Sequence, residues 1–285
     1  MNDLLVKGNP FLGANQDYKS SKLVIIGAPM DFTVSFKPGT RFGPQSIREV
    51  SESLEEYSPY QDKDLLNYSY YDAGDVVLPF GNVPKSLNKL GKVVDQVLTD
   101  GKIPLVLGGE HLITLAPVQQ LAYRYPDLAV VQFDAHADLR SDYLGEHLSH
   151  ATVMRRVTEV VRGKNLFQLG IRSGTADEFT YGRQNTEFHP FEILTPLKQI
   201  WDQLKRHPLY ITIDIDVVDP AFAPGTGTPE PGGCTSAEII QAILTLQGLN
   251  VVGLDIVEVC PVYDPSDRTA ILAAKLAREA IMLFG

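Results

Sequence analysis

The sequence is poor in cysteine and in long apolar segments. Its two cysteines, Cys234 and Cys260, form no CxxC pair and are too few for a disulfide framework, so we expect two reduced, inert thiols. No stretch approaches the roughly 20 apolar residues of a membrane span. The N-terminus has no apolar segment behind a basic one, which argues against a signal peptide. We therefore expect a soluble, cytoplasmic protein without a membrane partner.

The sequence is also short of positive charge. Its 25 lysines and arginines stand against 35 acidic residues, which gives a net charge of −10. Phosphate binding requires clustered basic residues, so nucleic acid is excluded as a partner, whereas a small cationic substrate is compatible.

What is present is enough apolar material for a large core, because 44% of the 285 residues are hydrophobic. We find no internal repeat, low-complexity tract or flexible linker, and predict one domain over residues 1–285.

Short apolar runs alternate with segments of helical spacing. The runs are KLVIIGAP, IPLVLGG, LAVVQFD, LFQLGIR, LYITIDID and VVGLDIVEV, and continuous apolar runs are typical of strands covered on both faces. The helical segments carry end signals: a stop at Gly101, a capping box from Thr235 to Glu238, and Ser266 and Asp267 as N-cap candidates for the last helix. This alternation predicts an α/β fold with a parallel sheet between helices.

Acidic residues and histidines collect where four of the predicted strands end. They are His111, the set Asp134, His136 and Asp138, the pair Asp214 and Asp216, and Glu258. Ligands of parallel α/β sheets bind at the carboxyl ends of the strands, so these residues predict one site. If the chain stays extended, the alternate spacing places Asp134, His136 and Asp138 on one face.

Carboxylates gathered in this way repel one another unless positive charge lies between them, which indicates a metal site. Aspartate and histidine without thiolate suit Mn²⁺, Mg²⁺ or Fe²⁺ better than structural zinc. Six candidate ligands favour two ions with bridging carboxylates. Taken singly, His111 is equally explained as a helix-start residue and Asp214 or Asp219 as a cap or turn residue; the combined set favours the site.

Two stretches, 37–44 and 219–233, are rich in glycine and proline. The second is long for a plain connection. It is either a rigid surface loop or a wall around the site, since long loops in compact domains often carry function.

These motifs together resemble the ureohydrolase family of arginases and agmatinases. The resemblance rests on GGEHLIT (108–114), FDAHADLR (133–140), SHAT (149–152), TIDIDVVDPAFAPGTGTPEPGG (212–233) and VEVCP (257–261), and it runs from about residue 23 to the end. It implies a three-layer α/β/α arginase-like fold with a mainly parallel eight-stranded sheet. It also implies a homo-oligomer, either a trimer or a hexamer.

The resemblance further implies two Mn²⁺ ions per subunit. One would be held by His111, Asp134, Asp138 and Asp214, and the other by Asp134, His136, Asp214 and Asp216, so that Asp134 and Asp214 bridge. A hydroxide between the ions would attack the guanidinium carbon, and Asp138 would carry the proton to the leaving nitrogen. Glu258 would pair with the guanidinium, and His150 would be a substrate-binding proton shuttle. His150 is also readable as a helix-start residue.

Three positions depart from the patterns of the family. Glu110 stands where Asp is usual, Cys260 stands where Asn is common, and Arg140 stands where arginases usually have Asn. The stretches LRSDYLGEHLSHAT and EEYSPY look like bacterial agmatinases, so the prediction is hydrolysis of agmatine to putrescine and urea. Asp142 and Glu146 either form an acidic mouth that favours the distal ammonium of agmatine or are solvated surface charges.

Two alternatives stay open. Another guanidino hydrolase of the family, a guanidinobutyrase or an arginase, is the first, and in a guanidinobutyrase Arg140 would meet the substrate carboxylate. A non-catalytic metal-binding or assembly protein that kept the scaffold is the second, and the complete set of candidate ligands argues against it.

Overall fold

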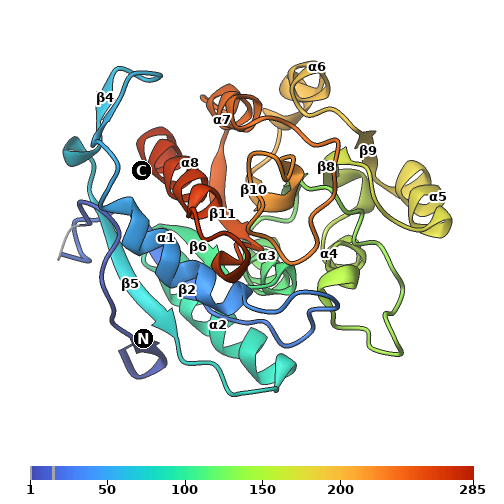
Figure 1. Ribbon diagram of the computed structural model, residues 1–285, viewed down its shortest axis with the longest axis horizontal. Coiled ribbons are helices and arrows are strands. Elements are labelled where there is room, and N and C mark those ends of the chain that lie inside the picture. The colour runs from blue at the N-terminus through green and yellow to red at the C-terminus, as the bar shows by residue number, and fades with distance from the viewer. Residues whose placement is uncertain (1, 15–16) are drawn as a thin grey trace.

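The computed structural model describes residues 2–14 and 17–285. Its centre is a nine-stranded sheet in the order β1-β5-β2-β6-β11-β10-β7-β8-β9 (Figure 1). The strands are β1 (Leu5–Val6), β2 (Leu23–Ala28), β5 (Tyr70–Val76), β6 (Ile103–Gly108), β7 (Ala129–Phe133), β8 (Leu166–Ile171), β9 (Glu187–Pro190), β10 (Leu209–Asp214) and β11 (Val251–Val257). Every neighbouring pair from β5 to β9 is parallel, and β1 joins β5 antiparallel. Strands β3 (Tyr57–Ser58) and β4 (Lys63–Asp64) form a separate small pair.

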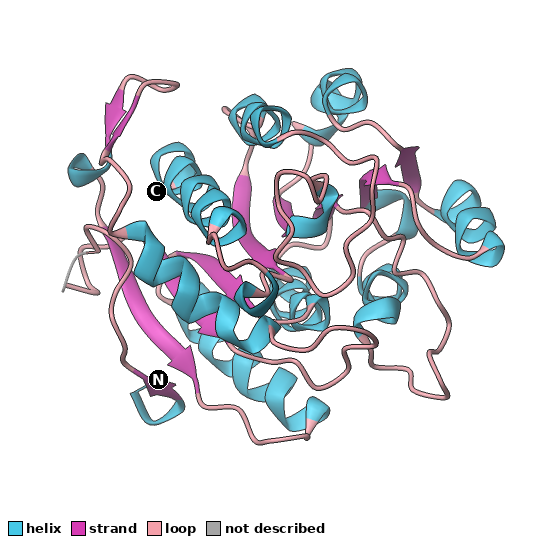
Figure 2. Cartoon of the chain, viewed as in Figure 1, coloured by secondary structure: helices cyan, strands magenta, loops and turns pink. Residues whose placement is uncertain are grey.

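Helices cover both faces of the sheet (Figure 2). They are α1 (Gly43–Ser51), α2 (Val83–Thr99), α3 (Leu115–Arg124), α4 (Val153–Val160), α5 (Ala176–Asn185), α6 (Leu194–Leu204), α7 (Ser236–Thr245) and α8 (Arg268–Phe284). Alternate strand residues enter two separate cores, as the period of two in a strand requires. Leu23 and Ile25 of β2 pack in the core of α1, α6, α7 and α8, whereas Val24 and Ile26 pack in that of α2, α3 and α4. The predicted three-layer α/β/α fold is confirmed.

All six strands expected from apolar runs are present. The sequence analysis had located neither β5 nor β9. In β5 the run is broken by Asp72 and Asp75, which pair with Arg48 of α1. Strand β9 lies at the edge and is half-buried, so it carries no apolar run. With these two, the parallel part has the expected eight strands, and β1 is an addition to it.

The expected end signals are found at all three helices, but at α8 the N-cap side chain is not the one that makes the capping hydrogen bond. Helix α2 ends at Thr99 and is followed by Gly101 with φ 71°, and the capping box of Thr235 and Glu238 opens α7. At α8, Asp267 occupies the N-cap position with a left-handed φ of 55°, and within the described residues its side chain makes no cap hydrogen bond. Asp264 caps instead: its Oδ2 accepts the Thr269 N–H at 2.8 Å.

Replacing Asp264 by alanine is expected to lower the free energy of unfolding by about 1–2 kcal/mol, the usual loss on removing an N-cap side chain. The Asp264 carboxylate also accepts the Ser266 hydroxyl at 2.5 Å, so the turn before α8 loosens as well. Urea denaturation measures the change. The matched control is Asp267→Asn, which keeps a residue tolerant of the left-handed backbone and should change stability by less than about 0.5 kcal/mol. Equal losses in both variants would contradict the capping role of Asp264.

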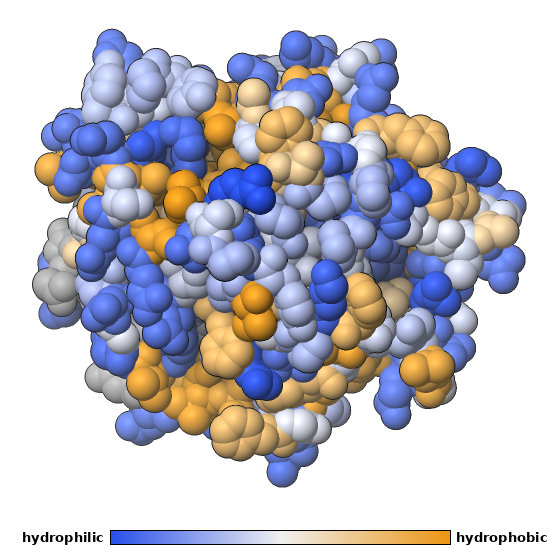
Figure 3. Space-filling model, in the orientation of Figure 1, coloured by the Kyte–Doolittle hydropathy of each residue, from blue (hydrophilic) through white to orange (hydrophobic). Residues whose placement is uncertain are grey.

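The surface is mixed: in Figure 3 hydrophilic and hydrophobic side chains are interspersed over the viewed face. Among the described residues, no helix combines the length and the apolar character needed to cross a bilayer.

Candidate metal centre

The strands that carry the predicted site residues are four neighbours in the middle of the sheet. Strands β6, β11, β10 and β7 lie in this order and run parallel, so their carboxyl ends meet at one edge. His111 and Glu258 follow β6 and β11, Asp214 ends β10, and Asp134 follows β7. The structure therefore brings these side chains to one edge of the sheet.

His111 lies at the centre of a first group of possible ligands. Its Nδ1 is 3.0 Å from Asp134 Oδ2, 3.1 Å from Asp138 Oδ2 and 3.4 Å from Asp214 Oδ2. Within the described part of the chain this buried nitrogen nevertheless has no partner in hydrogen-bonding geometry. Acceptor atoms that converge on one point without bonding one another fit the coordination of a cation.

A second group shares one carboxylate with the first. It consists of Asp134, His136 and Asp216, whose ligand atoms all lie within 4.8 Å of one another, as those of His111, Asp134 and Asp138 also do. His136 Nδ1 is 2.8 Å from Asp216 Oδ2 and 3.8 Å from Asp134 Oδ1. Asp134 thus stands between the two groups. Asp214 approaches His111 but belongs to neither compact group, so its bridging role stays a prediction.

The expected extended conformation does not persist through these residues. Strand β7 ends at Phe133, and residues 134–138 form an irregular segment in which Asp138 has φ 52°. Backbone N–H groups hold the carboxylates instead: Asp134 Oδ1 accepts from His136 N at 2.6 Å, and Asp216 Oδ1 accepts from Ala135 N at 3.0 Å. The segment bends because these bonds turn it back on itself, and the bend gathers groups that a straight strand would have spread out.

The electrostatics of the cluster call for positive charge. Burial, together with the charges of Asp216 and Asp138, raises the pKa of Asp134 to about 7. Burial and the charges of Asp216 and Asp134 raise the pKa of Asp214 well above its ordinary value. Burial opposes protonation of His136, but Asp216 and Asp134 outweigh it and raise its pKa to about 11. A bound cation would relieve this repulsion, and the oxygen and imidazole donors fit Mn²⁺, Mg²⁺ or Fe²⁺.

The two groups lie at a cavity of about 300 Å³ that also includes His150 and Glu258. Lining residues that the sequence analysis did not name are Ser35, Tyr143, Ser173, Gly174, Thr175, Glu178 and Thr228. The sequence does indicate a structural role for Glu178, because the spacing of Thr175 and Glu178 is that of a capping box, which they form at the start of α5. The others lie on irregular segments without a periodic pattern.

Glu258 is held firmly behind the first group. It has φ 63°, its Oε1 accepts the His111 N–H at 2.6 Å, and its own N–H donates to Gly109 O at 2.9 Å. Gly109 must be glycine, because a Cβ there would lie 1.9 Å from Met30 O. Burial raises the pKa of Glu258 to about 8. A buried carboxylate with one oxygen facing a cavity suits a cationic ligand.

His150 opens a short 3-10 helix, η5 (His150–Thr152), so the helix-start description holds, and it also lines the cavity. The ring Nε2 of His150 is hydrogen-bonded to Ser35 Oγ at 3.0 Å, and the backbone N–H of His150 donates to Thr33 Oγ1 at 3.0 Å. The Thr33 hydroxyl donates in turn to Glu110 at 2.8 Å, so Glu110 supports the segment that faces His150. Burial lowers the pKa of His150, which favours the neutral ring.

Arg140 lies at the mouth of the cavity. Its Nε is 3.5 Å from Glu178 Oε2, and its guanidinium carbon is 5.2 Å from the centre of the Tyr143 ring. Asp142 and Glu146 are exposed and are not part of the described cavity wall, which agrees with the solvated interpretation of both. Glu178, the carboxylate that Arg140 contacts, does line the cavity.

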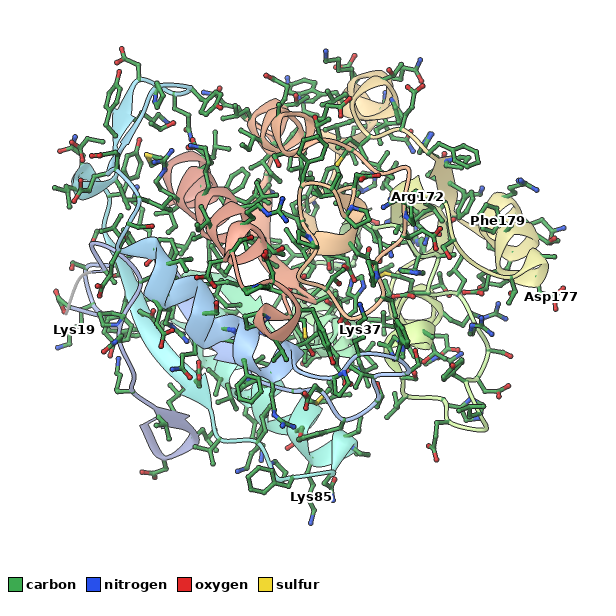
Figure 4. All side chains as sticks on the ribbon, in the orientation of Figure 1. Lys19, Lys37, Lys85, Arg172, Asp177 and Phe179 are labelled. Carbon is green, nitrogen blue, oxygen red and sulfur yellow. The ribbon has the colours of Figure 1, made fainter. Side chains whose placement is uncertain are left out.

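The glycine- and proline-rich stretch 219–233 contributes to the wall through Thr228. Arg172, labelled in Figure 4, ties this stretch to the edge that carries the candidate ligands: its Nη2 donates to Asp216 O and to Glu230 O, both at 2.7 Å, and its Nε donates to Pro231 O at 3.2 Å. Of the two interpretations, the wall describes the position of this loop better than a plain surface connection.

The cysteines take no part in either ligand group. Burial raises the pKa of both Cys234 and Cys260 to about 12, so neither thiol is activated as a nucleophile. Cys260 is fully buried beside Gly39, and Cys234 is partly exposed.

A parallel sheet with two histidine and aspartate groups at its open edge defines a metallohydrolase type of site. The chain belongs to the arginase family, whose model matches residues 21–283. It is 48% identical over 283 residues to an agmatinase of Bacillus anthracis, covering 98% of both chains. It is 35% identical to a guanidinobutyrase of Pseudomonas aeruginosa, over 90% of this chain and 84% of the relative. A crystal structure of a putative agmatinase from Clostridium difficile superposes with a TM-score of 0.90 at 37% identity, covering 94% of this chain and 99% of the other.

Proposed function

We propose that the protein is an agmatinase that hydrolyses the guanidino group of agmatine to putrescine and urea. The observation that carries this proposal is the pair of ligand groups sharing Asp134 beside a cavity that contains Glu258. The full-length similarity to agmatinases supports the choice of substrate.

The proposed ions are two Mn²⁺. His111, Asp134, Asp138 and Asp214 would hold one, and Asp134, His136, Asp214 and Asp216 the other, which places oxygen and imidazole donors around both. When bound, such ions lower the pKa of a bridging water enough for hydroxide to form near neutral pH.

The side chains of the cavity supply the remaining chemistry. Glu258 would pair its carboxylate with the planar guanidinium and so hold the carbon over the ligand groups. Asp138 would accept the proton of the attacking hydroxide and deliver it to the leaving nitrogen, which must be protonated to depart. His150, neutral and hydrogen-bonded to Ser35, would contact the substrate and exchange protons with solvent at the mouth.

A guanidino acid hydrolase is the second candidate, because Arg140 presents a positive charge at the cavity mouth. The similarity to a guanidinobutyrase also supports it. The contact of Arg140 with Glu178 favours agmatine, since part of that positive charge is offset before a substrate enters.

Three further predictions accompany the proposal. A single domain over residues 1–285 is supported by the continuous nine-stranded sheet. A trimer or hexamer and a cytoplasmic location follow from the family resemblance and from the composition.

The substrate is tested by measuring urea release from agmatine, 4-guanidinobutyrate and arginine after loading the purified protein with Mn²⁺. We expect kcat/KM for agmatine to exceed that for the other two by at least about 100-fold. Both of those substrates carry a carboxylate, and desolvating a charge that has no matched partner costs several kcal/mol. A preference for 4-guanidinobutyrate would replace agmatinase by the second candidate. No urea from any of the three would contradict the guanidino hydrolase assignment itself.

A further inference from the structure

A buried row of hydroxyl groups lies behind His111, on the side of its ring opposite the candidate ions. His111 Nε2 is 2.9 Å from Thr212 Oγ1, and Thr212 Oγ1 is 3.4 Å from Thr114 Oγ1. The Thr114 hydroxyl donates to Asp255 Oδ2 at 2.7 Å. His111, Thr114, Thr212 and Asp255 are all at most 1% exposed, so the row is separated from bulk solvent.

The row is built into the sheet. Thr212 of β10 and Asp255 of β11 are paired residues of neighbouring parallel strands, so their side chains stand side by side on one face. Thr114 comes from η4 (His111–Thr114), the 3-10 helix that begins with His111. Tyr210 of β10 donates a second hydrogen bond to Asp255 Oδ2 at 2.7 Å. A buried carboxylate is costly, and these two hydroxyl donors stabilise its Oδ2, whereas Oδ1 has no hydrogen-bond partner among the described residues.

The chemistry of these groups gives the row a direction. Nδ1 of His111 faces three carboxylates, and an ion there needs the Nδ1 lone pair. The ring proton must then be on Nε2, where it is donated to Thr212. The Thr212 hydroxyl is free to donate onward to Thr114, and Thr114 donates to Asp255, which as a carboxylate only accepts.

We propose that Asp255, acting through Thr114 and Thr212, is the positioning group that keeps the His111 proton on Nε2 and so reserves Nδ1 for a metal ion. This inference rests on the proposed metal site. It assigns a use to an acid inside the apolar run VVGLDIV, where a residue that served packing alone would be apolar. Without the acceptor at the end of the row, a proton on Nδ1 facing Asp134 and Asp138 would compete with the ion. Outer partners of this kind affect metal affinity by about 10- to 100-fold.

The test compares Thr212→Val, which keeps shape and removes the hydroxyl, with Thr212→Ser, which keeps the hydroxyl. Each full-length variant is stripped of metal and titrated with Mn²⁺, while the paramagnetic resonance signal of free Mn²⁺ reports the number of bound ions and their Kd. We expect Thr212→Val to bind one of two ions about 10- to 100-fold more weakly. Thr212→Ser should remain within about threefold of the parent protein.

Two more variants make the experiment decisive. Thr114→Val keeps the side-chain shape, removes the link between Thr212 and Asp255 and should weaken the same ion, so it supplies the comparison if Thr212→Val does not fold. Thr40→Val is the matched control, because Thr40 is buried and its hydroxyl has no partner among the described residues. Its Mn²⁺ affinity should not change.

Unchanged affinity in Thr212→Val or Thr114→Val would overturn the inference while leaving the metal site intact. A loss in Thr212→Val that serine does not restore would also overturn it, because packing would then be the cause. A parent protein that binds no Mn²⁺ would instead remove the proposed metal site, and the inference with it.

Discussion

An Asp134→Asn variant is expected to bind fewer than two Mn²⁺ ions and to lose more than about 100-fold in kcat/KM for agmatine. Asp134 is the carboxylate shared by the two compact groups, and its two oxygens face different histidines. An amide supplies one neutral oxygen and a nitrogen that cannot coordinate, so neither ion keeps its ligand set. The loss should exceed the 10- to 100-fold found for outer-shell changes.

The metal-free form of this variant should stay folded. Neighbouring acids repel the Asp134 carboxylate, so removing its charge relieves repulsion, and we expect a change in unfolding free energy below about 2 kcal/mol. Metal analysis, urea release and thermal unfolding of the same preparation separate the effects. Asp202→Asn, at an exposed position of α6, serves as the charge-matched control. Two tightly bound ions and full activity in Asp134→Asn would contradict the bridging role.

A Glu258→Gln variant is expected to retain both ions but to lose about 10²–10³-fold in kcat/KM. Removing one member of a desolvated charge pair costs several kcal/mol, and each 1.4 kcal/mol is a factor of ten. Glutamine keeps an oxygen able to accept the His111 N–H, so the backbone beside the first ligand group should hold its place. This variant therefore separates substrate recognition from metal binding.

Steady-state kinetics with agmatine, together with metal analysis, checks the Glu258 prediction. Glu192→Gln, an exposed position before α6, removes the same charge elsewhere and should match the parent protein. Loss of an ion in Glu258→Gln would show that Glu258 acts through His111 rather than on the guanidinium. Unchanged kinetics would remove its proposed contact with substrate.

The sequence was most informative where one physical rule dominated. Strands buried on both faces must be continuously apolar, so β2, β6, β7, β8, β10 and β11 were readable, and their ends located the candidate site. Edge strand β9 escapes this rule because it is only half-buried, and β5 because Arg48 satisfies the two acids inside it.

Details that depend on distant partners were not readable. The bend of residues 134–138 is held by hydrogen bonds that include one from Ala135 to Asp216, a residue 81 positions away. Asp267 was among the expected N-cap residues of α8 and holds that position, but the capping hydrogen bond comes from Asp264, which the sequence pattern did not indicate. The role of Asp255 could not be recognised from the sequence, since its partners Thr114 and Tyr210 come from other segments.

At Asp138 and Glu258 the positive φ lowers the stability of the fold, whereas the carboxylate at the same position is proposed to act in catalysis. Each left-handed backbone costs roughly 1–2 kcal/mol for a residue with a side chain, and glycine would avoid that cost. Glycine has no carboxylate, however, so the residue best for stability and the residue proposed for the chemistry differ at both positions. Selection for a more stable chain would therefore tend to remove activity first at these two positions, and the surrounding sheet must supply the free energy that holds them.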